Sequence, residues 1–204
     1  MKTPPLFVTG IGTNVGKTIV SAVLCEQLEA DYWKPVQSGD LHYTDSDQVR
    51  ALISNASTRI YPEAFRFKLA ASPHQAAEEE GIAISAGDFR LPETENSLIV
   101  EGAGGLFVPL SSSFMMIDLI RQLDVQVVLV ARNYLGCINH TLLSISALKQ
   151  YGIPLKQVVF NGDFPAATTN IIIKQLPDGT TWSQLPEFKK LDKQILCSQK
   201  KLLI

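Results

Sequence analysis

Hydrophobic residues along this chain fall in short runs that alternate with amphipathic segments. Runs that are apolar at successive positions predict buried strands, and they cover residues 6–8, 32–36, 98–100, 125–131 and 157–160. Helical spacing of the apolar positions predicts helices over residues 17–29, 45–53, 73–80 and 139–151. Fully buried strands separated by helices indicate an α/β fold, with a mostly parallel sheet covered by helices on both faces.

A glycine-rich segment connects the first predicted strand to the first predicted helix. It reads Gly10-Ile11-Gly12-Thr13-Asn14-Val15-Gly16-Lys17-Thr18, which has the composition and context of a P-loop. In such a loop backbone N–H groups hold phosphate, Lys17 would contact the β- and γ-phosphates, and Thr18 would ligate magnesium. Five residues separate Gly10 from Gly16, where a generic P-loop has about four. The alternative is a glycine turn that only starts a helix, and the complete strand, loop and helix favour phosphate binding.

A second lysine and several carboxylates follow other predicted strands. Lys34 lies in an apolar strand beside Pro35, which is unusual because ammonium groups are seldom buried without a partner. It is either a second cation beside the substrate or an edge-strand lysine that reaches solvent. Glu101 ends a buried strand and can hold magnesium directly or through water. Asp45 and Asp47 are candidates for a second carboxylate, and spacing does not separate them, because either could instead cap a helix.

Composition and charge narrow the class of protein. The 204 residues predict one domain over 1–204. Eighteen basic and twenty acidic residues give a net charge of −2, so no strong positive field is expected to hold nucleic acid. No apolar run approaches the roughly 20 residues of a membrane span, and the N-terminus lacks the pattern of a signal peptide. Three widely spaced cysteines predict no disulfide framework and fit a reducing cytoplasm.

Taken together, the motifs resemble the dethiobiotin synthetase family, the ATP-dependent ligases of biotin synthesis. The matching segments are residues 8–18, 34–39, 46–47, 72–74, 101–105, 109–111 and 135–140. The five-residue spacing in the glycine loop is the normal spacing of that family. The blocks K-P-V-x-S-G and L-G-C-I-N-H are specific, since other P-loop families do not carry both.

This resemblance implies a P-loop NTPase-like α/β fold, a homodimer and a reaction. The reaction joins 7,8-diaminononanoate (diaminopelargonate), CO2 and MgATP into a cyclic urea and releases ADP and phosphate. Lys17 and Lys34 would be the catalytic residues. The implied magnesium ligands are Thr18, Asp47 and Glu101. The implied nucleotide contacts are Asn14, Val15, Gly16, Lys17, Thr18, Ile19, Asp47, Glu101, Gly102, Ala103, Gly104 and Asn161, the last of these at adenine. The implied diamine contacts are Thr13, Ser38 and, at the substrate carboxylate across the dimer, Gly136, Cys137, Ile138 and Asn139.

Two other functions remain open on the sequence. Another P-loop enzyme, such as a small-molecule kinase or an amidating ligase, would explain Lys17 and Thr18 but not Lys34 together with the 136–139 block. A P-loop switch ATPase would bind membranes through a basic amphipathic tail. Residues 187–204 carry five lysines against two acidic residues, with a possible apolar stripe of Phe188, Leu191, Ile195, Leu202 and Leu203. A surface helix packed on the domain is the ordinary explanation for such a stripe.

Overall fold

The computed structural model describes residues 4–188 and 190–198. Its centre is a seven-stranded sheet with the strand order β11-β10-β9-β1-β6-β2-β4, and all neighbouring strands are parallel. These strands are β1 (Leu6–Gly10), β2 (Asp31–Trp33), β4 (Ile60–Tyr61), β6 (Leu98–Gly105), β9 (Gln126–Arg132), β10 (Leu155–Asn161) and β11 (Thr181–Leu185). Two small sheets flank it, formed by β3 (Val36–Ser38) with β5 (Phe65–Phe67) and by β7 (Pro109–Ser111) with β8 (Phe114–Met115).

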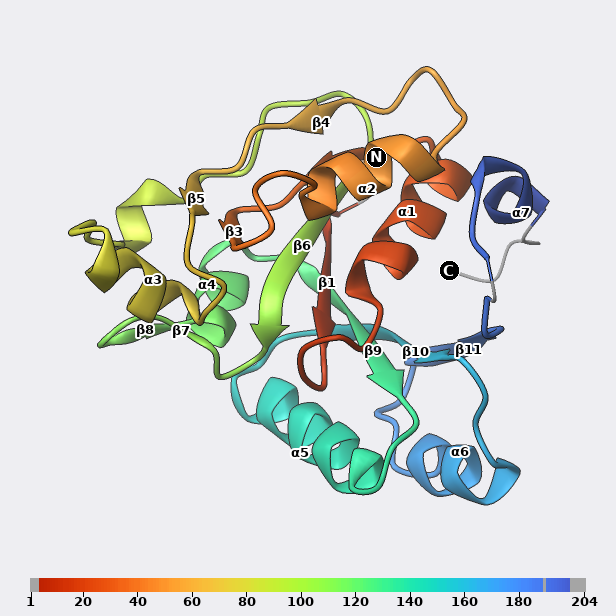
Figure 1. The fold of residues 1–204 in the computed structure, drawn as a ribbon. Coiled ribbons are helices and arrows are strands. Elements are labelled where there is room, and N and C mark those ends of the chain that lie inside the picture. The colour runs from red at the N-terminus through yellow and green to blue at the C-terminus, as the bar shows by residue number, and fades with distance from the viewer. Residues whose placement is uncertain (1–3, 189, 199–204) are drawn as a thin grey trace.

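Helices cover both faces of the large sheet (Figure 1). One face carries α1 (Lys17–Leu28), α2 (Asp45–Leu52) and α7 (Lys193–Ser198), which share one hydrophobic cluster with the sheet. The other face carries α4 (Met116–Gln122), α5 (Cys137–Gln150) and α6 (Ala166–Ile173), which pack in a second cluster. The helix α3 (Pro73–Glu79) packs on the small sheets, and a short 3-10 helix covers Ala86–Asp88. The predicted α/β class, with a parallel sheet between two helical layers, is confirmed.

The segment predicted as one strand over 32–36 is two strands in different sheets. β2 ends at Trp33, and β3 begins at Val36 and pairs with β5. Pro35 explains the break, since proline has no N–H to donate to a sheet ladder. Its carbonyl instead accepts hydrogen bonds from the N–H groups of Ala64 and Phe65. Lys34 therefore lies at the carboxyl end of β2 rather than inside a strand.

The register of the central strands brings three segments to one edge of the sheet. β1 pairs with β6 so that Val8 lies opposite Glu101, and β2 pairs with β6 so that Trp33 lies opposite Val100. Lys34 consequently emerges next to Glu101. The loop after β1 emerges beside both, because β1 and β2 flank β6. Ligands of open α/β sheets bind at this edge, outside the carboxyl ends of the strands.

The C-terminal segment packs on the domain as far as the structure describes it. α7 contacts α1 and α2, and its Leu196 is buried in their hydrophobic cluster, with Leu191 packed against it. Leu202 and Leu203 of the predicted stripe lie outside the described residues. Within the described ranges, no helix is both long enough and apolar enough to cross a membrane.

Candidate functional site

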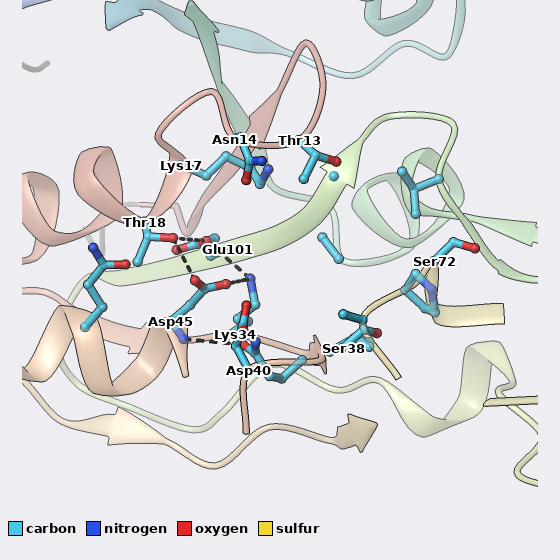
Figure 2. A pocket seen from close by; sticks show the side chains of 18 of the residues that line it. Thr13, Asn14, Lys17, Thr18, Lys34, Ser38, Asp40, Asp45, Ser72 and Glu101 are labelled. Atoms are coloured by element: carbon cyan, nitrogen blue, oxygen red, sulfur yellow. Dashed lines mark hydrogen bonds and ion pairs between the residues drawn. The ribbon is translucent and has the colours of Figure 1, made fainter. Parts of the chain in front are cut away.

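A cavity of about 680 Å³ opens at the carboxyl ends of β1, β2 and β6 (Figure 2). Its walls come from the glycine loop, the segment after β2, the start of α2, the end of β6 and the segment before α3. The residues expected in the site that line it are Thr13, Asn14, Gly16, Lys17, Thr18, Ile19, Lys34, Ser38, Glu101, Ala103 and Gly104. One cavity thus holds both candidate catalytic lysines.

The glycine loop holds Lys17 at the start of α1. Gly16, directly before it, has a φ of 95°, a left-handed conformation that glycine adopts without steric cost. The Nζ atom of Lys17 donates to the carbonyl of Gly12 at 3.3 Å, and the side chain is mostly buried. Burial lowers the pKa of Lys17 below its ordinary value; the carboxylate of Glu101 opposes this shift and the Lys34 ammonium adds to it. The two ammonium groups therefore lie close enough to affect each other's charge.

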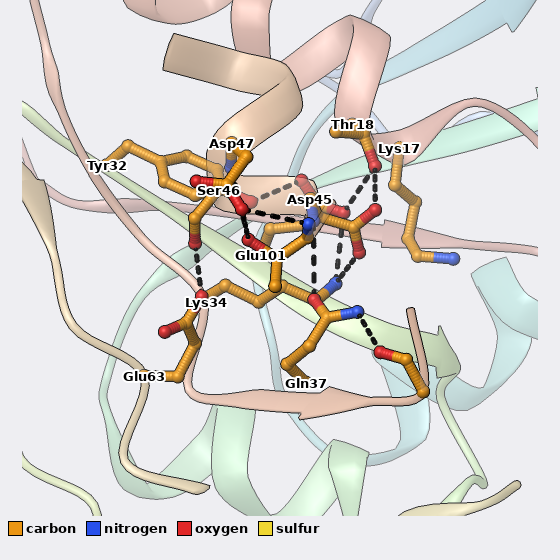
Figure 3. Close-up of polar contacts among 12 residues, drawn as sticks. Lys17, Thr18, Tyr32, Lys34, Gln37, Asp45, Ser46, Asp47, Glu63 and Glu101 are labelled. Atoms are coloured by element: carbon orange, nitrogen blue, oxygen red, sulfur yellow. Dashed lines mark hydrogen bonds and ion pairs between the residues drawn. The ribbon is translucent and has the colours of Figure 1, made fainter. Parts of the chain in front are cut away.

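Lys34 is buried between two carboxylates (Figure 3). Its Nζ atom lies 2.5 Å from Oδ2 of Asp45 and 3.2 Å from Oε1 of Glu101. Burial alone would lower the pKa of Lys34, but the charges of Glu101 and Asp45 outweigh it and raise the pKa above its ordinary value. Lys34 is therefore a cation at neutral pH, held in place by its partners.

Oxygen atoms suited to a divalent cation gather beside Lys34. The Thr18 hydroxyl lies 2.9 Å from Oε1 of Glu101 and 3.1 Å from Oδ1 of Asp45. Mg²⁺ prefers such hard oxygen ligands, and it commonly takes only one or two carboxylates from the protein and the rest from phosphates and water. In the part of the chain that is described, no group of three or more His, Cys, Asp or Glu side chains could hold a metal. The donor set fits Mg²⁺ bound together with phosphate.

Asp47, expected among the magnesium ligands, does not join this cluster. It closes a capping box with Thr44, whose N–H donates to Oδ2 of Asp47 at 3.0 Å, and it forms an ion pair with Arg50 at 2.8 Å. Asp45 occupies the cluster position instead. The two residues are separated by about 200° around the helix axis, so only one of them can face the glycine loop. The structure thus separates two carboxylates that spacing alone left equivalent.

The far wall of the cavity is less polar. It includes Val108, Ala70 and Pro73 beside Thr13 and Ser38. The hydroxyl of Ser38 is buried and has no hydrogen-bond partner among the described residues. A buried hydroxyl without a partner is costly, so this group is available to a polar atom of a ligand.

Besides Asp47, three expected nucleotide contacts do not line the cavity: Val15, Gly102 and Asn161. Asn161 is buried, and its Nδ2 donates to the carbonyl of Val15 at 2.9 Å, so it braces the glycine loop. Gly102 lies against Phe7, where an added Cβ would come within 2.7 Å of the ring. That glycine is needed for close packing under the site.

The segment from Gly136 to Asn139 also lies outside this cavity. It forms the start of α5, where Gly136 has a φ of 104° and Cys137 is buried. The preceding Leu135 is fully exposed.

Two side chains that the sequence analysis did not single out support the carboxylates. The hydroxyl of Tyr32 donates to Oε2 of Glu101 at 2.9 Å, and Oε1 of Gln37 accepts from the N–H of Asp45 at 3.4 Å. Burial raises the pKa of Tyr32 well above its ordinary value, and the charge of Glu101 acts in the same direction, so its hydroxyl keeps its proton. Strand alternation puts Tyr32 on the same side as Lys34, but only the register of β2 with β6 reveals its partner.

Comparisons with known proteins agree with the motifs and the fold. A family model described as an AAA domain matches residues 5–194. ATP-dependent dethiobiotin synthetases from Christiangramia forsetii and Cytophaga hutchinsonii are each 46% identical to this chain, over 93% of it and over 91% and 92% of their own lengths. The cell division ATPase MinD of Pyrococcus furiosus, with 15% identity, has a similar structure (TM-score 0.56, covering 91% of this chain and 84% of that one). A ParA family ATPase from Chlorobium tepidum also has a similar structure, with 13% identity and a TM-score of 0.52. The match covers 92% of this chain and 85% of that one.

The two structural likenesses concern the fold alone, because the sequences share so few residues. The likeness to the synthetases is one of sequence, with 46% identity over nearly the full length of both chains. The chain therefore belongs to the dethiobiotin synthetase family.

Proposed function

We propose that this chain is an ATP-dependent dethiobiotin synthetase that closes a cyclic urea from 7,8-diaminononanoate (diaminopelargonate) and CO2, releasing ADP and phosphate. The observation that carries the proposal is the placement of two lysines, Lys17 and Lys34, in one cavity beside the oxygen atoms of Thr18, Asp45 and Glu101. Similarity to named synthetases over nearly the full length of both chains supports the same activity.

The phosphates of ATP would lie on the glycine loop. Its N–H groups and the N-terminus of α1 favour an anion, and Lys17 adds a point charge. Thr18, Asp45 and Glu101 would hold Mg²⁺, with Asp45 taking the role first expected of Asp47. The bound ion would offset the charge of the phosphates. Asn161, held against the loop by Val15, is the residue proposed at the adenine.

The reaction would proceed in three steps. One amine of the substrate adds to CO2, loses a proton and becomes a carbamate. A carbamate oxygen attacks the γ-phosphorus, the bond to ADP breaks, and a carbamic–phosphoric anhydride forms. The second amine attacks the carbonyl carbon, phosphate leaves with the bonding electrons, and the ring closes with loss of a proton.

The two lysines would serve the step in which two anions meet. A carbamate and a triphosphate repel each other, and charge interactions are stronger in a site with little water. Lys34 is already charged and fixed before any ligand binds, so little reorganisation is needed when negative charge develops. Holding the reacting groups together provides the rest of the rate enhancement.

The diamine would lie along the less polar wall, with its amines near Thr13 and Ser38. Its carboxylate would meet the start of α5 from a second subunit, where Gly136, Ile138 and Asn139 offer backbone N–H groups at a helix N-terminus. The N–H of Cys137, in the same segment, donates to the carbonyl of Tyr134. The exposed side chains of Leu135 and Leu143 suit a contact between subunits, and we propose a homodimer. The three cysteines are free thiols, which fits a cytoplasmic location.

The test is a reconstitution in which each component is left out in turn. Purified protein receives MgATP, the diamine and bicarbonate, and the release of ADP and the formation of dethiobiotin are followed together. We expect one ADP per dethiobiotin, and ADP release that needs both the diamine and CO2. Phosphorylation of the diamine without CO2 would support a small-molecule kinase instead. ADP release stimulated by lipid vesicles, with no dethiobiotin formed, would support a switch ATPase.

A further inference from the structure

Tyr32 lies directly behind the carboxylate of Glu101. The two residues come from neighbouring parallel strands, β2 and β6, and both are fully buried. The hydroxyl of Tyr32 donates to Oε2 of Glu101 at 2.9 Å. The other oxygen, Oε1, faces the site, where Thr18 lies at 2.9 Å and Lys34 at 3.2 Å (Figure 3). The two oxygens of the Glu101 carboxylate thus have different partners: Oε2 contacts the core, and Oε1 contacts the site.

The position of the Tyr32 hydroxyl is fixed by packing. Its ring belongs to the hydrophobic cluster between the sheet and the helices α1 and α2, which includes Cys25 and Val49. A ring held in a packed core has few other rotamers. The hydroxyl is therefore a fixed donor, and the carboxylate that accepts from it is fixed as well.

We propose that Tyr32 is a positioning residue that orients Glu101 for a divalent cation. The hydrogen bond to Oε2 keeps Oε1 directed at Thr18 and Lys34, so that a Mg²⁺ ion meets a ligand already in place. This inference rests on the proposed function only in taking Glu101 as a magnesium ligand. Groups that orient metal ligands by hydrogen bonds commonly affect metal affinity by about tenfold or more when they are removed.

Asp45 is held by a different group, which makes the effect of Tyr32 separable. The N–H of Asp45 meets Oε1 of Gln37, whose Nε2 donates to the carbonyl of Gly39. Removing the Tyr32 hydroxyl therefore leaves the support of Asp45 unchanged. We expect only the carboxylate of Glu101 to become less firmly oriented.

The test compares Tyr32→Phe with Tyr61→Phe. Tyr61, on the neighbouring strand β4, also donates its hydroxyl to a carboxylate, Oδ2 of Asp31 at 3.4 Å, and to the carbonyl of Glu93 at 3.0 Å. Each variant removes one hydroxyl from the same region of the sheet, but only Tyr32 touches the site. The measurement is the binding of Mn²⁺ in the presence of ADP, followed by electron paramagnetic resonance, together with the Mg²⁺ concentration for half-maximal ADP release.

We expect Tyr32→Phe to weaken Mn²⁺ binding roughly tenfold and to raise the Mg²⁺ requirement by a similar factor. ADP binding without metal should stay within about twofold of the wild type, since the glycine loop is untouched. Tyr61→Phe should leave both metal measurements unchanged. Wild-type Mn²⁺ affinity in Tyr32→Phe, with affinity lost in Glu101→Gln, would overturn the proposal.

Two precautions keep the outcome decisive. If Tyr32→Phe melts near the assay temperature, the titration is made at lower temperature with ADP bound first, because a ligand stabilises the folded state. Mn²⁺ binding needs neither the diamine nor CO2, so it tests Tyr32 separately from the reaction. A wild-type protein that binds Mn²⁺ and ADP but forms no dethiobiotin would contradict the proposed function and leave the role of Tyr32 measurable.

Discussion

At the scale of single residues, the site depends on mutual compensation of buried charges. Lys34, Asp45 and Glu101 bring one cation and two carboxylates into contact beneath the glycine loop. Each would be costly to bury alone, because removing a charge from water without a partner costs several kcal/mol. Together they form a preorganised group whose carboxylates face Thr18 and whose ammonium faces the cavity.

The assignment of the second carboxylate can be tested with two alanine variants on one helical turn. Asp45→Ala should raise the Mg²⁺ concentration for half-maximal ADP release about tenfold or more, because a proposed ligand is lost. Asp47→Ala should leave that concentration unchanged and lower the free energy of unfolding by about 1 kcal/mol, because a capping contact of α2 is lost. A raised Mg²⁺ requirement in Asp47→Ala, with wild-type dependence in Asp45→Ala, would restore the first expectation.

At the scale of elements, the end of α1 is tied to its neighbours by one carboxylate. Glu26 accepts hydrogen bonds from the N–H and hydroxyl of Ser54, from Asn55, and from the thiol of Cys197 on α7. Burial raises its pKa, but these hydrogen bonds outweigh burial and lower the pKa to about 2. Glu26 thus joins α1 to the segment after α2 and to the C-terminal helix.

This contact predicts a pH dependence of stability. The pKa of Glu26 is lower in the folded protein than the value near 4.3 of an unfolded chain. Its stabilising contribution is therefore complete above about pH 4.3 and is lost as the pH falls towards 2. Glu26→Gln should lower the melting temperature at pH 7. This gap in melting temperature between the variant and the wild type should shrink as the pH falls below about 4.5. Glu29→Gln, which among the described residues affects a hydrogen bond from Ser57, is the matched control. A gap for Glu26→Gln that stays constant down to pH 2 would contradict this role.

Most of the central strands, four of the helices and the glycine loop were predictable from the sequence. The helices α4 and α6, the strand β11 and the contacts that depend on rotation and register were not predicted. A run such as 125–131 indicates a buried strand, because it is rich in β-branched residues and is apolar at positions that face both sides of the sheet. The two-residue strand β4 has too few residues to show a pattern. The choice between Asp45 and Asp47 depends on how α2 is rotated against α1, and the Tyr32 contact depends on the pairing of β2 with β6. Pro35 signalled the end of β2, but the prediction extended the strand through it.

At the scale of the whole molecule, the described chain completes only part of the proposed substrate site. The cavity would hold the phosphates of ATP and the amine end of the diamine, whereas the start of α5 is not among the residues that line it. Exposed apolar side chains beside that helix start, including Leu135 and Leu143, are the proposed subunit contact. The dimer would thus be required for catalysis as well as for stability.

The dimer can be tested by placing a charge on this surface. Leu135→Glu should give monomers in light scattering and raise the KM for the diamine about tenfold or more, because burying an unpaired charge at an interface is strongly unfavourable. Ile171→Glu introduces the same charge at an exposed position of α6 and should leave the dimer and the KM unchanged. A wild-type protein that is monomeric and fully active would contradict the shared site.

The central claim is that two fixed cations in one cavity allow two anions to react. The most direct measurement is the rate of dethiobiotin formation by Lys34→Gln at saturating MgATP, diamine and bicarbonate, with ADP binding and the melting temperature measured on the same sample. We predict a rate at least about 100-fold below that of the wild type, in a folded protein that still binds ADP. A near-normal rate in Lys34→Gln would contradict the claim.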